Sequence, residues 1–199
     1  MAAAEREEFW NLPNTITIAR LAVLPVLAAF PWFREHSVLV GWLFILSALG
    51  DFADGYLARR SGAITSIGKH LDPLADKLTS ATALIVLLGM GRIPSLGPLE
   101  SPQWASVAVA VIIGRELAVT GLRGFGTEFG QVIAAGWPGK LKTLSQNFAA
   151  GFLLFPEGTL GLPNHRIGGL LLALAVVLTL WSGWGYFAGF FGRAHARPK

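Results

Sequence analysis

The sequence predicts an all-α integral membrane protein with six transmembrane helices and a short juxtamembrane helix at its N-terminus. Hydrophobic residues make up 53% of the 199 residues and charged residues only 14%, and the mean hydropathy is +0.54. This composition lies outside the range of ordinary soluble domains. The apolar residues gather in runs long enough to cross a bilayer. We therefore expect one membrane-embedded domain over residues 1–199, with residues 1–12 as an interfacial segment or a solvated tail.

The apolar runs follow one another along the whole chain, separated by polar or Gly/Pro-rich connections. We expect the six spans at about 16–33, 38–57, 69–88, 104–122, 140–155 and 167–187. Pro25 lies inside the first run and predicts a kink there, which a spanning helix tolerates. Small and polar residues at 61–68 predict a loop, and residues 124–139 predict a mixed connection.

Basic residues are distributed unequally between the two sides that this topology defines. All Lys and Arg residues except Arg34, Arg92 and Arg166 fall on the side of the two termini. By the positive-inside rule, the termini face the cytoplasm. The net charge of +4 is then explained by basic loops that face anionic lipid, so we expect a membrane lipid partner and no nucleic acid.

Four carboxylates lie close together in the sequence DFADGYLARRSGAITSIGKHLDPLAD, which spans residues 51–76. Asp51 and Asp54 are three residues apart and Asp72 and Asp76 are four apart, so each pair shares one face of its helix. The two helices are joined by a short loop and must run antiparallel, which brings their aspartates together. Four carboxylates at such distances repel one another unless cations lie between them. Hard oxygen ligands suit Mg²⁺ or Mn²⁺.

Alternatives to a catalytic metal site remain open for these aspartates. Nearby bases could neutralise them, although three bases do not balance four acids. Acidic residues in membrane helices also mark ion paths, so a divalent-cation transporter is an alternative. A non-catalytic protein that binds a CDP-lipid is another. The clustering of the acids at one face of the membrane argues against a transporter.

The spacing Asp54-Gly55-(x2)-Ala58-Arg59-(x8)-Gly68-(x3)-Asp72-(x3)-Asp76, preceded by Asp51, matches the signature of the CDP-alcohol phosphotransferase family at every fixed position. The sequence therefore resembles that family. The resemblance implies a six-helix fold, a homodimer, and a site for two divalent ions that opens to the cytoplasm. It also implies a multi-pass protein of the bacterial inner membrane.

The resemblance assigns a role to each residue of the motif. The metal ligands would be Asp51, Asp54, Asp72 and Asp76, and Asp76 would also be the catalytic base. The small residues Gly55, Ala58 and Gly68 would cradle the cytidine, and Arg59 would contact the diphosphate. Two metals in such a site neutralise the charge that develops on the leaving CMP.

Three further stretches narrow the choice of acceptor alcohol. Residues 11–25, 115–123 and 139–146 resemble the branch of the family that joins CDP-diacylglycerol to sn-glycerol 3-phosphate, releasing CMP and forming phosphatidylglycerol phosphate. The dianionic phosphate of that acceptor needs a cationic pocket. Candidates at the cytoplasmic ends of the fourth and fifth spans are Arg115, Arg123, Lys140 and Lys142. Glu116 lies two turns before Arg123 on the same face, so these two side chains could orient one another.

Other interpretations of these residues remain open. Inositol phosphate, serine or phosphatidylglycerol are alternative acceptors, and serine needs no pocket for a dianion. Lys140 and Lys142 could instead be snorkelling bases at a helix end. Asn14, Thr17 and Arg20 are candidates for lining the nucleotide side of the site.

Overall fold

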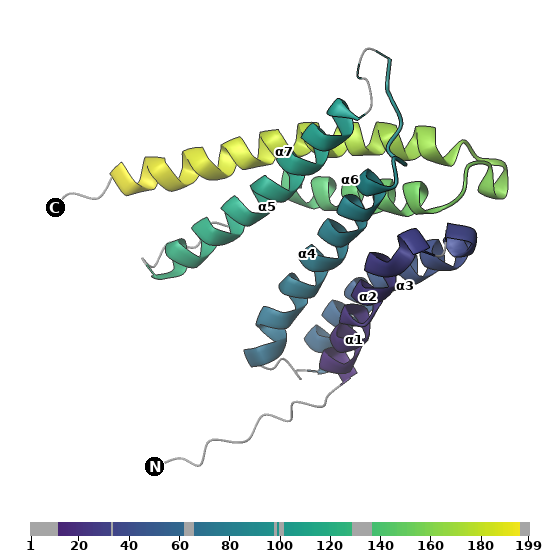
Figure 1. The fold of residues 1–199 in the computed structure, drawn as a ribbon. Helices are drawn as coiled ribbons and strands as arrows, with labels where there is room; N and C mark the ends of the chain where they lie inside the picture. Colours follow the sequence, from purple (N-terminus) through teal and green to yellow (C-terminus); the bar gives the residue numbers. More distant parts are fainter. Residues whose placement is uncertain are drawn as a thin grey trace. The chain divides into compact units, whose positions relative to one another are not determined.

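The computed structural model describes residues 12–32, 34–61, 66–97, 99, 102–128 and 137–195, and they are almost entirely helical (Figure 1). Within these residues there is no β-strand, only an isolated bridge between Leu96 and Leu99. The all-α class predicted from the sequence is therefore confirmed for the described part of the chain. The N-terminal segment 1–11 lies outside these residues, so its placement on the membrane surface stays a prediction.

The helices follow the order of the predicted apolar runs. Their bounds are α1 Leu12–Leu21, α2 Val23–Ala29, η1 Phe30–Trp32, η2 Arg34–His36, α3 Ser37–Ser61, α4 Ser66–Gly89, α5 Gln103–Glu128, α6 Trp137–Leu154, η3 Thr159–Gly161 and α7 Asn164–His195. The chain divides into two compact units, Met1–Val86 and Leu87–Lys199. The single domain over residues 1–199 stays a prediction.

Three of the described stretches are long and apolar enough to cross a membrane: Asn14–Trp32, Gln103–Phe125 and Asn164–Phe190. Large apolar side chains on these stretches point outward, since Leu117 is 70% exposed and Trp184 78% exposed. Exposed apolar surface of this kind marks a region that contacts lipid or another protein, and the length of these stretches favours lipid. The structure thus supports a membrane protein, and the full set of six spans stays a prediction.

Several predicted helix boundaries were wrong: α5 continues to Glu128, inside the predicted connection 124–139, α7 continues to His195, and two helices begin earlier than expected. Helix α4 begins at Ser66 rather than near Lys69, so Gly68 lies in its first turn and not in a loop. Helix α6 begins at Trp137 rather than at Lys140, with Pro138 as its second residue. Proline suits the first turn of a helix because the missing N–H would have no partner there. The apolar pattern marked only the apolar part of each helix, and both helices begin before it.

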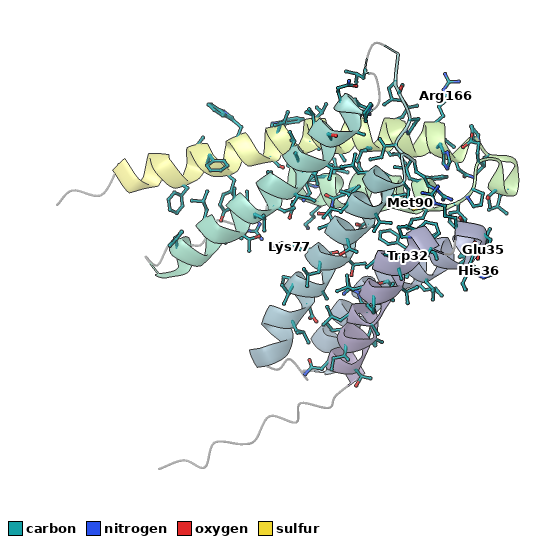
Figure 2. All side chains as sticks on the ribbon, in the orientation of Figure 1. Trp32, Glu35, His36, Lys77, Met90 and Arg166 are labelled. Carbon is teal, nitrogen blue, oxygen red and sulfur yellow. The ribbon has the colours of Figure 1, made fainter. Side chains whose placement is uncertain are left out.

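The kink expected in the first run is a break between α1 and α2. Ala22 is in a turn, although its N–H still donates to the carbonyl of Ile18 at 3.1 Å. Pro25 explains the position of the break, because its ring crowds the carbonyl four residues earlier and it has no N–H to donate to that carbonyl. After α2 the chain turns through Trp32, Glu35 and His36, whose side chains are all exposed (Figure 2).

In the first unit, α1 packs against α3. Gly50 of α3 makes this approach close, since a Cβ atom there would lie 3.4 Å from Cδ of Arg20 and 3.5 Å from Cγ2 of Ile16. The residue after Gly50 is Asp51, so α1 lies against α3 immediately beside the first aspartate of the motif. The core of this unit contains the fully buried side chains of Leu27 and Phe30.

In the second unit, α7 packs along α6 and α5. Gly168 permits close contact with α6, because a Cβ atom there would lie 2.7 Å from Cγ of Leu153 and 3.1 Å from the carbonyl oxygen of Ala149. The C-terminus of α6 is capped by Arg92, whose Nη1 donates to the carbonyl oxygens of Leu154 at 2.7 Å and Leu153 at 3.4 Å. This contact satisfies carbonyls that have no partner within the helix.

Candidate active site

The motif aspartates lie on two consecutive helices of the first unit. Asp51 and Asp54 belong to α3, and Asp72 and Asp76 belong to α4. The small residues Gly55 and Ala58 and the basic residue Arg59 are also in α3, while Gly68 is in α4. Side chains from 51 to 70 lie outside those that the structure describes, so only the helical placement of these residues is known.

The aspartates of α3 and α4 lie at similar distances from the facing ends of the two helices. Residues 62–65 separate α3 from α4, so the facing helix ends are within about 18 Å of each other. At about 1.5 Å per residue, Asp54 lies ~10 Å before the end of α3 and Asp72 lies ~9 Å after the start of α4. Asp51 and Asp76 each lie ~15 Å from the same helix ends. An antiparallel pair of helices would therefore bring Asp54 level with Asp72 and Asp51 level with Asp76.

Asp72 is held by a hydroxyl from α1. The side chain of Thr17 is completely buried, and its Oγ1 donates a hydrogen bond of 2.5 Å to Oδ1 of Asp72. A hydroxyl that donates to a carboxylate forms a short, charge-assisted hydrogen bond. This contact fixes the rotamer of Asp72, while the carboxylate itself remains half-buried.

Asp76 lies beside a buried cation from the same helix α1. Nη2 of Arg20 is 3.9 Å from Oδ1 of Asp76, and the two side chains are 4% and 30% exposed. This distance is too long for a hydrogen bond, so the contact is electrostatic. The stem of Arg20 lies against Gly50 of α3, so α1 contacts both helices that carry the aspartates.

The described side chains contain no group of three or more acidic or histidine residues that could hold a metal. Asp51 and Asp54 are not among the side chains covered, so the four-carboxylate site stays a prediction. Asp72 and Asp76 fit such a site, since they are one turn apart on α4 and both are partly exposed. Thr17 supplies the kind of outer hydrogen bond that orients carboxylate ligands of metals.

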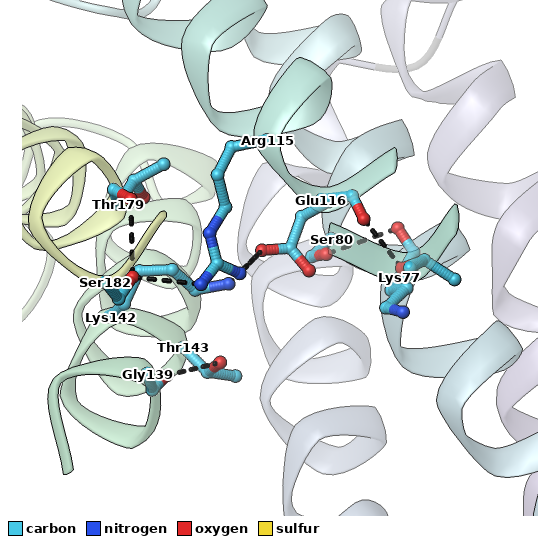
Figure 3. Close-up of polar contacts among 10 residues, drawn as sticks. Lys77, Ser80, Arg115, Glu116, Gly139, Lys142, Thr143, Thr179 and Ser182 are labelled. Atoms are coloured by element: carbon cyan, nitrogen blue, oxygen red, sulfur yellow. Dashed lines mark hydrogen bonds and ion pairs between the residues drawn. The ribbon is translucent and has the colours of Figure 1, made fainter. Parts of the chain in front are cut away.

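A second group of polar side chains lies in the other unit, on α5, α6 and α7 (Figure 3). We call Arg115, Glu116 and Lys142 the basic cluster. Oε1 of Glu116 accepts a hydrogen bond of 3.2 Å from Nη1 of Arg115 and another from Nζ of Lys142. All three side chains are mostly buried, with exposures of 14% for Arg115, 18% for Glu116 and 5% for Lys142. One carboxylate therefore joins two cations within the helical packing.

Helix α7 supports the cluster on the far side of Arg115. Nη2 of Arg115 donates to Oγ of Ser182 at 3.0 Å, and this hydroxyl donates to the carbonyl oxygen of Thr179 at 3.3 Å. The next residue, Gly183, leaves room for the Arg115 stem, because a Cβ atom there would lie 3.3 Å from Cγ of Arg115. Arg115 is thus fixed between α5 and α7.

The other two bases predicted for the acceptor pocket, Arg123 and Lys140, lie outside the basic cluster. Arg123 is exposed, and its guanidinium carbon is 5.5 Å from the centre of the Tyr186 ring. Lys140 is exposed near the start of α6. Glu116 pairs with Arg115 and Lys142, not with Arg123 as the shared helix face suggested. Of the four predicted bases, the structure brings only Arg115 and Lys142 together.

Sequence reasoning missed the partners in this cluster. Ser182 gave no signal, because a serine in an apolar helix is ordinary. Glu116 did give one, as the single acid in the fourth apolar run, 104–122. An acid in such a run needs a partner, but sequence spacing alone pointed to a partner on the same helix.

The chain is similar to known proteins over most of its length. A family model described as CDP-alcohol phosphatidyltransferase matches residues 10–181. A Bacillus subtilis protein named CDP-diacylglycerol--glycerol-3-phosphate 3-phosphatidyltransferase is 40% identical over 193 residues, which cover 90% of this chain and 94% of the relative. A Rickettsia bellii protein of the same name is 34% identical, over 89% of this chain and 93% of its own length.

A third relative carries a different but related name. A Mycobacterium tuberculosis protein named probable phosphatidylglycerophosphate synthase is 38% identical over 190 residues, which cover 93% of this chain and 84% of the relative. The family model and these relatives span both units and every residue of the aspartate motif. The chain belongs to the CDP-alcohol phosphatidyltransferase family.

Proposed function

We propose that this chain transfers the phosphatidyl group of CDP-diacylglycerol to sn-glycerol 3-phosphate, giving phosphatidylglycerol phosphate and CMP. The observation that carries the proposal is the likeness, over about nine-tenths of both chains, to relatives named for this reaction. The intact aspartate motif and the buried basic cluster supply the two kinds of residue that the reaction needs. The expected function and acceptor therefore agree with the relatives.

The aspartates would serve the donor. Asp51, Asp54, Asp72 and Asp76 would hold two divalent ions, Mg²⁺ or Mn²⁺, through carboxylate oxygens. When bound, such ions neutralise negative charge on the diphosphate and on the departing CMP. Arg59 would add a cation to the diphosphate, and the absence of bulky side chains at Gly55, Ala58 and Gly68 would leave space for the cytidine ring.

The chemical step is a substitution at the phosphorus of the phosphatidyl group. The acceptor hydroxyl oxygen forms a new bond to this phosphorus, and the bond to the oxygen bridging to CMP breaks. The bridging oxygen leaves with CMP, and the hydroxyl proton passes to Asp76 as the general base. Thr17 supports the step by fixing Asp72, and Arg20 keeps a positive charge beside Asp76.

The basic cluster would serve the acceptor. A phosphate dianion is recognised best by cations that are already oriented and partly removed from water. Arg115 and Lys142 meet this description, because both are mostly buried and share a single carboxylate. The exposed bases Arg123 and Lys140 would guide the acceptor from outside, and their effect on binding would be smaller.

The remaining expectations belong to the same proposal. The chain would cross the bacterial inner membrane six times, with the active site facing the cytoplasm, and would work as a homodimer. Three apolar helices and the positive-inside distribution support a multi-pass protein. Membrane lipid would surround the exposed apolar side chains, and no nucleic acid is involved.

The test is CMP release by the purified full-length protein in detergent micelles that contain CDP-diacylglycerol. Each acceptor is added separately: sn-glycerol 3-phosphate, inositol phosphate, serine and phosphatidylglycerol. We expect release only with sn-glycerol 3-phosphate, dependent on Mg²⁺ or Mn²⁺ and abolished by a chelator. Release with a different acceptor would replace the acceptor assignment. No release with any acceptor, together with divalent-ion flux into proteoliposomes, would favour the transporter instead.

A further inference from the structure

Glu116 is the residue that unites the basic cluster of the second unit. It lies on α5, and its single oxygen Oε1 accepts hydrogen bonds from a neighbour on the same helix and from Lys142 on α6. Because Arg115 is also fixed to Ser182 of α7, the carboxylate connects side chains from three helices. Neither the chemical step nor the binding of the donor requires this acid.

The cluster joins two cations to a single carboxylate oxygen among mostly buried side chains. Cations that are oriented in this way and partly removed from water are favourable partners for an anion such as a phosphate. Three buried polar atoms on the cluster's helices also have no hydrogen-bond partner within the described residues. They are Nε of Arg115 itself, Oε1 of Gln146 on α6 and Oγ1 of Thr179 on α7. Gln146 is one turn after Lys142 on the same face of α6. A buried polar atom without a partner in the protein can accept or donate a hydrogen bond to a water, an ion or a ligand.

We propose that Glu116 is a positioning residue for the acceptor, holding the ammonium of Lys142 and the guanidinium of Arg115 together so that both reach one phosphate group. This proposal rests on the proposed function, since it concerns the acceptor of that reaction. Glu116 touches neither the phosphate nor the reacting atoms. It acts through the two bases.

The physical reason lies in the burial of Lys142. Its side chain is only 5% exposed, so removal of the Glu116 charge leaves a buried ammonium without its carboxylate. Such a group either loses its proton or moves to a more polar place. In either case Lys142 no longer contributes its charge at the position that the acceptor phosphate would occupy. Arg115 keeps its contact with Ser182, so the site weakens but the packing of α5 on α7 persists.

The test compares Glu116→Gln, Glu116→Asp and the control Glu157→Gln by steady-state kinetics with both substrates varied. We expect Glu116→Gln to raise the acceptor KM about tenfold or more, as loss of one partner in a buried charge pair does. The KM for CDP-diacylglycerol and kcat should stay within about twofold, because the donor residues are untouched. Glu116→Asp should rescue part of the effect. Glu157, whose carboxylate is 52% exposed and contacts His165, should show none.

A double variant separates positioning from a purely structural role. If Glu116 acts through Lys142 as well as Arg115, Glu116→Gln should raise the acceptor KM less in the Lys142→Met background than in the unaltered protein, because only the effect on Arg115 remains. Additive effects, an unchanged or lowered acceptor KM in Glu116→Gln, or an equal rise in both KM values would overturn the proposal. Should Glu116→Gln not fold, Glu116→Asp decides: an acceptor KM equal to that of the unaltered protein overturns it.

The acceptor that the unaltered protein uses distinguishes failure of the positioning role from failure of the proposed function. If the unaltered protein uses a different phosphorylated alcohol, the same variants are measured with that acceptor. The ratio of acceptor KM between each variant and the unaltered protein then tests the positioning role in the same way. If it uses only an alcohol without phosphate, both proposals are overturned.

Discussion

The two polar regions of this chain carry opposite charge and are held in opposite ways. In the first unit, Asp72 and Asp76 are partly exposed on one helix and are contacted by buried groups of α1. In the second unit, Arg115 and Lys142 are the functional candidates, and a carboxylate between them holds both. The first region has acids oriented by a hydroxyl and a cation; the second has cations oriented by an acid.

This contrast fits the ligand that we propose for each region. A site for divalent ions needs carboxylates that still have room for another ligand, and exposure of 30% at Asp76 leaves such room. A site for a phosphate needs cations that are fixed in place before the ligand arrives. The supporting residues Thr17 and Glu116 are therefore as informative as the charges they orient.

The largest expected effect comes from the acidic region. Asp76→Asn would remove the proposed base and a proposed metal ligand at once, so CMP release should fall by at least about 10³-fold. Melting in detergent should change little, because the carboxylate is partly exposed. The control is Glu35→Gln, whose side chain is 69% exposed in the turn before α3. Retention of more than a tenth of the activity by Asp76→Asn would remove it from the chemistry.

The next effect separates the two lysines of the basic region. Lys142→Met should raise the acceptor KM about 100-fold, because a buried cation next to the ligand is lost. Lys140→Met should raise it by no more than about threefold, since exposed charges are screened by solvent. The measurement is the acceptor KM at saturating CDP-diacylglycerol. Equal effects of the two changes would mean that burial does not define the acceptor site.

A smaller effect is expected at the support of Asp72. Thr17→Val keeps the shape of the buried side chain but removes the hydroxyl that donates to Asp72. Loss of such an outer hydrogen bond weakens metal binding about tenfold, which can be measured by Mn²⁺ titration in electron paramagnetic resonance without any turnover. Thr17→Ser should restore affinity, and Thr15→Val, at an exposed position, should leave it unchanged. Unchanged Mn²⁺ affinity in Thr17→Val would separate Thr17 from the metal site.

The smallest effect concerns stability alone. Arg92→Leu leaves the last carbonyls of α6 without their donor, a loss of about 1 kcal/mol. For a chain of this length the thermal midpoint should fall by about 3 °C. Arg166→Leu is the matched control, because that arginine is exposed at the start of α7 (Figure 2). If both changes lower the midpoint equally, the contact of Arg92 with α6 contributes nothing specific.

The sequence predicted the class of the fold, the order of the helices and the family. These follow from features that are local in sequence: the length of apolar runs and the spacing of eight motif residues over 51–76. The break near Pro25 was also predictable, although its position at Ala22 depends on the geometry of the preceding turn. The starts of α4 and α6 were not predictable, because both helices begin in polar or proline-containing sequence before the apolar pattern sets in.

Contacts between helices could not be predicted in the same way. Thr17 was a candidate for the nucleotide side, and its hydrogen bond to Asp72 bridges 55 positions of sequence. Lys142 pairs with Glu116 across 26 positions, and Arg115 reaches Ser182 across 67. Helical periodicity reports which residues share a face, but the partner of that face depends on how helices pack. For this reason the residues proposed for the donor could be named from the motif, whereas the bases proposed for the acceptor could be ranked only after their burial was known.

The central claim is that the acids serve the donor and the buried bases serve the acceptor. Calorimetric titration of CDP, with Mg²⁺ present, into Asp72→Asn and Lys142→Met tests it most directly, since neither turnover nor acceptor is needed. We predict that Lys142→Met binds CDP as the unaltered protein does, while Asp72→Asn binds it at least about tenfold more weakly because a metal ligand is lost. Normal CDP binding by Asp72→Asn, or equal weakening in both variants, would contradict the division of roles between the two regions.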